Sequence, residues 1–292
     1  MNRQTKAYIF ALSAVFFWST VATAFKLALR FYTPLQLIFL SALVSLIVFG
    51  VFLVVSSKFG FLFRQSPKDL FMSAFMGLLS PTAYYLVLFK AYSLLPAQIA
   101  QPLNYTWTIV LVLLSVPMLK QKLTLRQLIG VIIGFFGAYV ISSQGHLFSF
   151  HIDSPTGVAL AVLSSVFWAL FWIFNVRDHR DETVKLFTNF FFGIIYLTVI
   201  MFLSGEWNFP RDWHLLGPVY IGLFEMGLTF FLWMKAMQLT VSSAKISNLV
   251  FLSPFLSLVF IHFILGEKLY FTTFLGLILI VGGILLEKTS GE

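Results

Sequence analysis

Long uninterrupted runs of apolar residues are the feature that most restricts what this chain can fold into. They recur from end to end, and many have the ~17–25 residues that a helix needs to cross a bilayer core about 30 Å thick. Of the 292 residues, 59% are hydrophobic and 10% are charged, whereas about a quarter are charged in a soluble domain. A membrane β-barrel would instead show short alternating segments. The sequence therefore predicts an all-α integral membrane protein.

Charged, Pro-rich and Gly-rich points divide the chain into ten predicted transmembrane helices. The first apolar run follows Arg3 and Lys6, but it is too long for the apolar part of a cleaved signal peptide, so we expect an uncleaved first span. No connection between spans is long enough to hold a separate soluble domain. The predicted spans are residues 7–29, 34–56, 70–92, 97–119, 124–142, 156–176, 185–203, 215–237, 243–265 and 271–287.

The distribution of basic residues predicts the orientation in the membrane. If the amino terminus is cytoplasmic, twelve Lys and Arg residues fall on the inner side and three on the outer side. This bias predicts that both termini lie in the cytoplasm. We expect the membrane to be a bacterial inner membrane. The net charge of +8 is therefore explained by topology, and we expect no nucleic-acid partner. The absence of cysteine excludes disulfides, thiol catalysis and Cys-based metal sites.

The second half of the sequence repeats the first half in order. This pattern predicts a duplication, with one five-helix repeat in residues 1–146 and another in residues 147–292. Because each repeat has an odd number of spans, the second must enter the membrane from the opposite side, and inverted repeats are the recurring architecture of secondary transporters. The matched pairs are Trp18 and Trp168, Lys90 and Lys235, Lys122 and Lys268, Gly130 and Gly276, and Gly137 and Gly283.

Four stretches carry a resemblance to a known family: "FFWSTVATAFKLAL", "LPAQIAQPLNY", "FEMGLTFFLWMKA" and "LGEKL". With them, the chain resembles the drug/metabolite transporter superfamily, in particular its ten-helix EamA-type exporters, which include amino-acid exporters of the YddG type. The resemblance implies a basket of helices around a central cavity, lined chiefly by helices 1, 3, 4, 6, 8 and 9. The first repeat reads "LKQKL" where the second reads "LGEKL", so we interpret Glu267 as a surface turn residue.

Glu225 is an acidic residue in the middle of the eighth predicted span. It lies ten residues after Leu215, which corresponds to about 15 Å of helix in a core about 30 Å thick. A carboxylate at this depth costs roughly 2.5–3.5 kcal/mol on insertion scales and usually faces a partner or a wet cavity. We expect it to bind the ammonium group of a substrate, a proton, or both in turn. The alternative is a protonated or paired acid with a structural role.

The repeat places Ser80 and Tyr84 at the positions of Glu225 and Thr229, so the predicted site has one acid without a symmetric twin. Polar stripes on the fourth and ninth spans predict two more lining helices, because polar side chains in apolar helices face protein or water. Snorkelling towards the membrane surface is the alternative for Lys245, and simple packing is the alternative for the aromatic residues. The remaining candidates for substrate binding and coupling are Gln98, Gln101, Asn104, Tyr105, Lys245, Asn248, Trp18 and Trp168.

Glycines in the fifth and tenth spans recur at helical spacing, and we expect them to let the two helices pack closely. They are Gly130, Gly134, Gly137, Gly276, Gly282 and Gly283.

The sequence contains no nucleophile with its base, no cluster of metal ligands and no nucleotide-binding motif. We therefore expect neither an enzyme nor a cofactor or metal site. Together with the resemblance, the architecture predicts a monomeric secondary carrier, embedded in the lipid bilayer, that exports small metabolites, amino acids or related amines, from the cytoplasm, with protons as a candidate coupling ion. The alternatives are an uptake carrier, a carrier of lipid-like amphiphiles, and a membrane-embedded solute sensor that does not transport.

Overall fold

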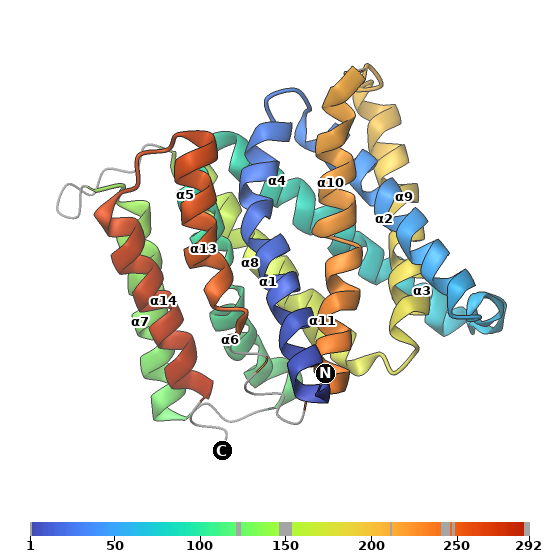
Figure 1. The fold of residues 1–292 in the computed structure, drawn as a ribbon, viewed down its shortest axis with the longest axis horizontal. Helices are drawn as coiled ribbons and strands as arrows, with labels where there is room; N and C mark the ends of the chain where they lie inside the picture. The colour runs from blue at the N-terminus through green and yellow to red at the C-terminus, as the bar shows by residue number, and fades with distance from the viewer. Residues whose placement is uncertain are drawn as a thin grey trace. The chain divides into compact units, whose positions relative to one another are not determined.

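Helices make up most of the described part of the chain (Figure 1). The structure is a computed structural model that describes residues 2–120, 124–145, 154–210, 212–240, 246 and 249–288. Within these ranges, eight helices are long and apolar enough to cross a membrane. Two shorter apolar helices, Leu252–Leu265 and Phe271–Leu286, fall in the ninth and tenth predicted spans. The all-α class is confirmed, while ten crossings in two inverted repeats remain a prediction.

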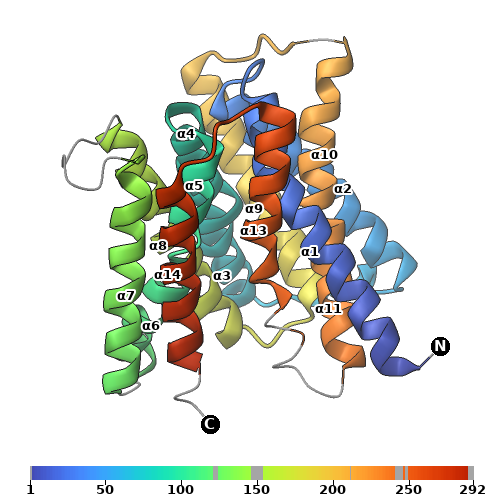
Figure 2. The ribbon, with the colours of Figure 1, turned by 60° about the vertical axis from the view of Figure 1, so that its left-hand side comes forward.

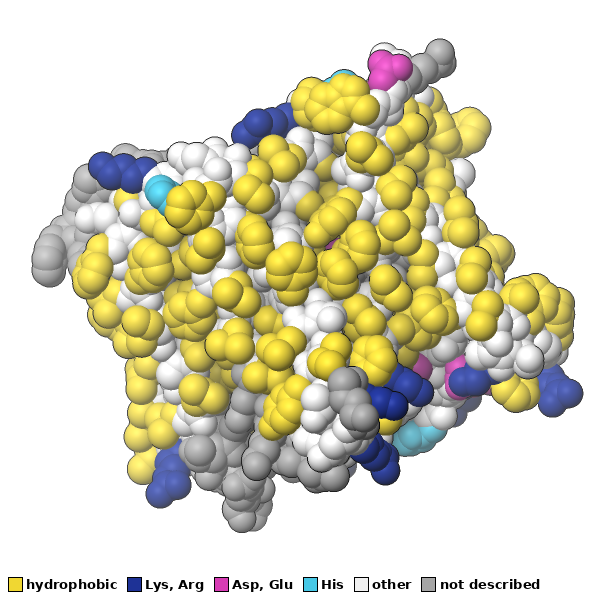
Figure 3. Space-filling view, in the orientation of Figure 1, with side chains coloured by type: hydrophobic (Ala, Val, Ile, Leu, Met, Phe, Trp, Pro, Cys, Tyr) yellow, Lys and Arg dark blue, Asp and Glu magenta, His cyan; other side chains and the backbone are white. Residues whose placement is uncertain are grey.

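The surface has the distribution of side chains that a lipid environment requires. On the face drawn in Figure 3, hydrophobic side chains cover most of the area, and Lys and Arg side chains gather towards its margins. Exposed apolar residues occur along most of the long helices, among them Val51, Phe136 and Phe202, which are 57%, 57% and 75% exposed. Lipid tails can contact such residues without the cost that water would impose.

The first of two compact units comprises Met1–Thr82 and Arg180–Leu265. In this unit, α1 packs against α10, α11 and α13, while α9 packs against α2 and α3. Its elements are α1 (Arg3–Ala28), α2 (Pro34–Val55), η1 (Phe59–Arg64), α3 (Pro67–Gly77), most of η2 (Leu78–Ala83), α9 (Glu182–Ser204), η3 (Asp212–Leu215), α10 (Leu216–Phe224), α11 (Leu228–Leu239), α13 (Leu252–Phe260) and η4 (Ile261–Leu265).

The second unit comprises Ala83–His179 and Gly266–Glu292. Here α8 packs against α4, α5 and α6, and α7 runs beside α14 (Figures 1 and 2). Each unit therefore contains segments from both predicted repeats, and the repeat boundaries remain a prediction. The elements of this unit are α4 (Tyr84–Leu94), α5 (Ala97–Asn104), α6 (Trp107–Leu119), α7 (Leu125–Ser142), α8 (Pro155–Arg177) and α14 (Phe271–Lys288).

Local sequence signals explain where several helices begin. In three of them the N-cap hydroxyl and the polar side chain three residues later each bind the other residue's backbone N–H group, which satisfies donors that the first turn leaves free. Proline at the start of α2 and α3 needs no such partner, since it has no N–H group. The three pairs are Thr33 and Gln36, Ser66 and Asp69, and Thr124 and Gln127.

Among the described residues, several predicted spans depart from a regular helix. The third span leaves helical geometry in η2, where Ser80 has φ −148° and ψ 124°. The fourth bends between α5 and α6, at Tyr105 and Thr106. The eighth breaks between α10 and α11, at Glu225–Gly227. Because Ser80 and Glu225 are matched by the predicted repeat, two related spans break at the same relative position.

Glycine residues bring α7 and α14 into backbone contact. A Cβ atom built on Gly283 would lie 2.5 Å from the carbonyl oxygen of Gly130, and one on Gly137 would lie 2.7 Å from that of Gly276. Only glycine permits such an approach, so the predicted packing role is confirmed for these residues. Gly282 differs from the prediction, because a Cβ atom there would meet nothing within 4 Å.

This pair of adjacent glycines gives a direct test of the α7–α14 contact. Gly283→Ala should lower the stability of the purified protein by roughly 1–3 kcal/mol, because overpacking forces the two backbones apart. Gly282→Ala should leave it unchanged or raise it slightly, since alanine favours the helix. Thermal unfolding in detergent measures both, and equal melting temperatures for the two variants would contradict the close contact.

Candidate functional site

Glu225 lies where the helix of the eighth span is interrupted. Its backbone N–H group donates to the carbonyl oxygen of Ile221 at 2.9 Å and closes the last turn of α10. Two residues later, Gly227 has φ −112° and ψ −97°, outside helical geometry. A Cβ atom on Gly227 would lie 2.8 Å from the Gly222 carbonyl oxygen, so glycine is required for this tight turn. Glu225 is half-buried at this turn.

Polar side chains satisfy carbonyl groups at the end of α10, just before the break. The hydroxyl of Thr229 donates to the carbonyl oxygen of Phe224. The hydroxyl of Ser45, on α2, donates to the carbonyl oxygen of Gly222 at 2.9 Å. Such partners are required in an apolar environment, because an unpaired backbone group there costs several kcal/mol. Thr229, a predicted site residue, is fully buried and contributes to the structure of the break.

Helix α1 runs along the break and contacts residues on either side of Glu225. The ring of Phe17 stacks on Phe224 with 4.3 Å between centroids. Next to it, Trp18 lies 6.2 Å from Phe230 and 5.3 Å from Trp233. The predicted residue Trp18 therefore lies on the helix that flanks the interruption, and both belong to the first unit. Ser80 belongs to the same unit, is 3% exposed and lies in the matching interruption of the third span.

A second group of predicted residues converges in the other unit. The ring of Tyr84 stacks on Trp168, with centroids 4.6 Å apart and planes at 24°. The hydroxyl of Tyr84 donates to Asn104 Oδ1 at 3.1 Å, and Asn104 Nδ2 donates to Ser164 Oγ at 2.9 Å. We call Tyr84, Asn104, Ser164 and Trp168 the aromatic–amide cluster. Both an aromatic face and a fixed amide are groups that can orient a small polar ligand.

Sequence reasoning missed Ser164 in this cluster. It lies in the "VLSSVFW" stretch, one helical turn before Trp168, and residues four apart share a helix face. That spacing could have indicated it. Trp172, four residues further along, extends the same face and lies edge-on to Trp168 at 6.0 Å between centroids.

Gln98 and Gln101 are both buried on α5 but differ in their partners. The amide of Gln98 bonds to the segment before α14: its Nε2 donates to the carbonyl oxygen of Lys268 at 2.9 Å, and its Oε1 accepts from the Tyr270 N–H group at 3.0 Å. These bonds join α5 to the segment before α14, so Gln98 has a structural role. Gln101 Oε1 has no hydrogen-bond partner among the described residues. Tyr105 is half-buried and follows the end of α5.

Glu267 has a role that its place in a turn did not reveal. Its carboxylate accepts hydrogen bonds from the backbone N–H groups of Ala97, at 2.8 Å, and Gln98, at 3.2 Å. These groups open α5, whose N-cap residue, Pro96, supplies no side-chain bond. A distant acid therefore caps the helix that carries Gln101 and Asn104. The quoted motifs "LPAQIAQPLNY" and "LGEKL" are linked by these bonds.

The remaining predicted residues, Lys245 and Asn248, lie outside the described residues. Within the described ranges, no three His, Asp or Glu side chains come close enough together to hold a metal ion.

Comparison with known proteins identifies relatives along the whole chain. The model of the EamA-like transporter family matches residues 5–143 and 155–287. An uncharacterized transporter of Clostridium kluyveri is 23% identical over 98% of this chain and 94% of its own length. The uncharacterized transporter YvbV of Bacillus subtilis is 28% identical over 74% of this chain and 70% of its own.

Two further similarities concern a named exporter and a solved structure. The aromatic amino acid exporter YddG of Ancylobacter novellus is 23% identical, over 79% of this chain and 79% of its own length. A crystal structure of another protein superposes with a TM-score of 0.67 at 20% identity, and covers 98% of this chain and 97% of that one. At this identity the structural match shows the fold alone.

The carboxylate cap on α5 can be tested by stability measurements. Glu267→Ala removes both acceptors and should destabilise the protein by about 1–3 kcal/mol, the cost of leaving buried donors unpaired. Glu267→Gln keeps one acceptor oxygen and should lie between that variant and the wild type. Lys268→Gln is the matched control, because Gln98 binds only the backbone of Lys268. If Glu267→Ala melts like this control, the cap does not stabilise α5.

Proposed function

The chain belongs to the EamA-like transporter family, and on that premise we propose that it is a secondary carrier that exports small metabolites by alternating access. Its family consists of membrane transporters, so a small-molecule substrate and a lipid environment follow. The export of amino acids or related amines, through a central cavity and with Glu225 at the binding and coupling site, is the specific proposal. The observation that carries it is the helix interruption at Glu225.

Interrupted helices have a known use in secondary transporters. Their half-helix ends and freed backbone groups bind substrates and coupling ions near the middle of the membrane, at the interface of inverted repeats. Here the interruptions fall at Ser80 and at Glu225, which the predicted repeat matches. The two ranges of the family match, 5–143 and 155–287, are of similar length and support the duplication. An irregular backbone of this kind favours a site over a lipid-facing surface.

A single acid gives the site two uses. A carboxylate can hold the ammonium group of an amino acid or amine, and it can also carry a proton. If substrate and proton compete for Glu225, proton movement in one direction would drive substrate movement in the other. Ser80, its counterpart in the repeat, has no charge and cannot do this, so the coupling would depend on one half of the duplicated chain.

The aromatic–amide cluster supports an amino-acid substrate. Trp168 and Tyr84 offer ring faces, and Asn104 offers an oriented amide within one unit. Gln101 adds a buried carboxamide oxygen that can accept a hydrogen bond from a ligand. The relative from Ancylobacter novellus is named an aromatic amino acid exporter, and rings of this kind would suit a substrate with an aromatic side chain.

We further propose that the carrier is a monomer in a bacterial inner membrane, with both termini in the cytoplasm and protons as the coupling ion. An uptake carrier and a non-transporting sensor are the alternatives. Flux into and out of proteoliposomes separates the three, since a sensor binds without moving solute. An exporter and an importer respond to an imposed proton gradient in opposite directions.

Replacement of Glu225 tests its role. Glu225→Gln should weaken the binding of amine substrates roughly 10- to 100-fold, since a hydrogen bond to a charged group contributes about 1.5–3 kcal/mol. It should also abolish the response of flux to an imposed pH gradient. Asp212→Asn, at an exposed acid of η3, is the control for loss of one acid elsewhere. Wild-type flux and pH response in Glu225→Gln, with the fold intact by melting, would refute the assignment.

The cluster can be dissected with two substitutions that separate its chemical groups. Tyr84→Phe keeps the ring that stacks on Trp168 but loses the bond to Asn104, whereas Trp168→Leu loses the aromatic face. Under the proposal, Trp168→Leu should reduce transport of aromatic amino acids more than that of aliphatic ones, and Tyr84→Phe should reduce both to a similar extent. Competition assays in proteoliposomes give these ratios. An unchanged preference in Trp168→Leu would exclude the ring face from substrate selection.

A further inference from the structure

The segment between α2 and α3 presents aromatic side chains outward from the protein. It contains η1, which has the sequence "FGFLFR" and buries none of its residues. Its three phenylalanines, Phe59, Phe61 and Phe63, are 45%, 45% and 81% exposed. Figure 1 shows this segment at the end of α2, where the chain turns into α3. A soluble surface would not favour so many exposed rings, so their exposure indicates a partner.

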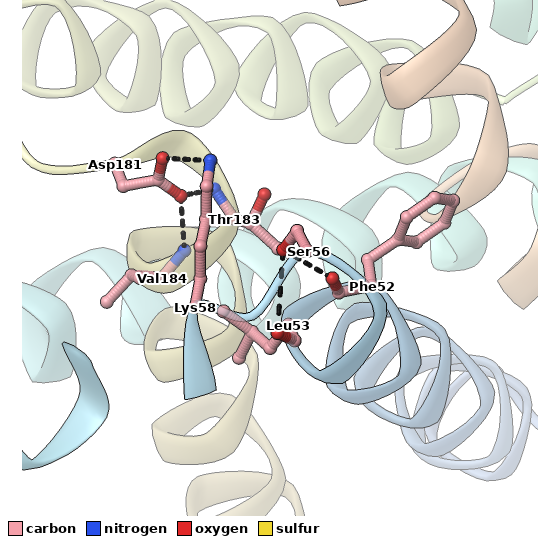
Figure 4. A network of polar contacts seen from close by, with 7 residues as sticks. All are labelled: Phe52, Leu53, Ser56, Lys58, Asp181, Thr183 and Val184. Atoms are coloured by element: carbon pink, nitrogen blue, oxygen red, sulfur yellow. Dashed lines mark hydrogen bonds and ion pairs between the residues drawn. The ribbon is translucent and has the colours of Figure 1, made fainter. Parts of the chain in front are cut away.

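Three polar contacts hold the ends of η1 against the start of α9 and the residues just before it. Before η1, Lys58 Nζ pairs with Asp181 Oδ2 at 2.5 Å (Figure 4). After it, Gln65 Nε2 donates to Thr188 Oγ1 at 3.1 Å, and Arg180 Nη1 donates to Gln65 Oε1 at 2.6 Å. The segment is therefore fixed at both ends, and the outward position of its rings is part of a defined structure.

The carboxyl group that binds Lys58 belongs to Asp181. Burial alone would raise the pKa of Asp181, but the hydrogen bond and charge of Lys58, with backbone N–H groups of α9, lower that pKa below the ordinary value of an aspartate. The carboxylate also caps α9 by accepting from the N–H groups of Thr183 and Val184. Figure 4 shows these groups around one carboxylate. The ammonium group of Lys58 is therefore paired within the protein.

The inward and outward faces of the segment differ in chemistry. Lys58, Leu62 and Gln65 are half-buried, and Lys58 and Gln65 bind Asp181 and Thr188. The outward residues are the three phenylalanines together with Arg64, whose guanidinium lies 5.6 Å from the centroid of the Phe61 ring. Lys68, at the start of α3, is also exposed. Rings interleaved with cations are typical of segments that lie in the headgroup layer of a membrane.

The rings continue an apolar surface on the neighbouring helices. Val55, at the end of α2, and Phe71, on α3, are each 77% exposed. In a membrane transporter these surfaces face lipid tails, so the adjoining rings lie where tails meet headgroups. Positive charges at that depth meet lipid phosphates, and each contributes about a fivefold preference for an anionic surface.

We propose that η1 is a lipid anchor: its phenylalanines enter the bilayer interface, while Arg64 and Lys68 bind the phosphate groups of anionic phospholipids. The anchor would hold the start of α3 and of α9 at a fixed depth, because the contacts of Lys58 and Gln65 join η1 to α9. This inference depends on the membrane location of the chain and not on its substrate or on Glu225.

A single probe at position 63 tests the anchor. The chain contains no cysteine, so Phe63→Cys gives one labelling site. Because Phe63 is 81% exposed, its loss removes little packing, and monodispersity and melting of the variant verify this. The full-length protein, labelled with a nitroxide, is reconstituted in vesicles of phosphatidylcholine or of phosphatidylcholine with phosphatidylglycerol. Collisions with oxygen and with a water-soluble nickel complex report the depth of the label.

We expect the label to be deeper in the vesicles that contain phosphatidylglycerol. Adding Arg64→Gln and Lys68→Gln should remove this difference, because two charges together account for about a 30-fold preference for the anionic surface. Arg126→Gln, a loss of charge on α7, should leave the label depth unchanged. High salt should reduce the phosphatidylglycerol effect, since exposed charges are screened.

Three results would overturn the proposal. A label open to the nickel complex in both vesicles would place η1 in water. Equal depth in both vesicles would mean that the rings insert without recognition of anionic headgroups. A label immobilised and shielded from both reagents would indicate a protein contact at this surface.

Discussion

The requirement that every backbone polar group finds a partner governs this structure. In the hydrocarbon core no water can bond to a free N–H or C=O group, so a chain that crosses it must be helical, and each interruption of a helix needs compensation. The interruption at Glu225 is compensated by hydroxyl groups, from Thr229 on its own span and from Ser45 on α2. The start of α5 is compensated by the carboxylate of Glu267, 170 positions away from Ala97. The irregular parts of the spans are therefore fixed by tertiary contacts.

Helices in lipid gain little from burying apolar surface against each other, since lipid tails are as apolar as leucine. Close packing of the backbones and hydrogen bonds between helices must therefore stabilise the helix–helix contacts. On α7 and α14, glycines allow direct backbone contact. Between α3 and α9, the hydroxyl of Tyr196 donates to the carbonyl oxygen of Ala74 at 3.1 Å. Large aromatic residues fill the spaces that remain, as Phe17 does against Phe224.

Interruptions in matched spans connect this architecture with transport. A continuous helix has no backbone group to offer a ligand, whereas an interrupted helix presents its ends within the membrane. The two interruptions differ in chemistry: one carries the carboxylate of Glu225 and the other the hydroxyl of Ser80. In the predicted repeat, the two halves would share a symmetric framework for conformational change, while the charge is assigned to one half. That difference is the physical basis of the proposed coupling.

The sequence by itself determined the membrane class, the approximate positions of the spans, the family and the unusual place of Glu225. These follow from composition, run length and spacing, which depend on residues close together in the chain. Only the tertiary structure decided that Gln98 and Glu267 bind each other's segments, that Asn104 joins Tyr84 to Ser164, and that Gly282 lies outside the helix contact. Each of these depends on which groups from distant segments come within hydrogen-bonding or van der Waals distance. Apolar periodicity cannot specify this, because most faces of a membrane helix are equally apolar.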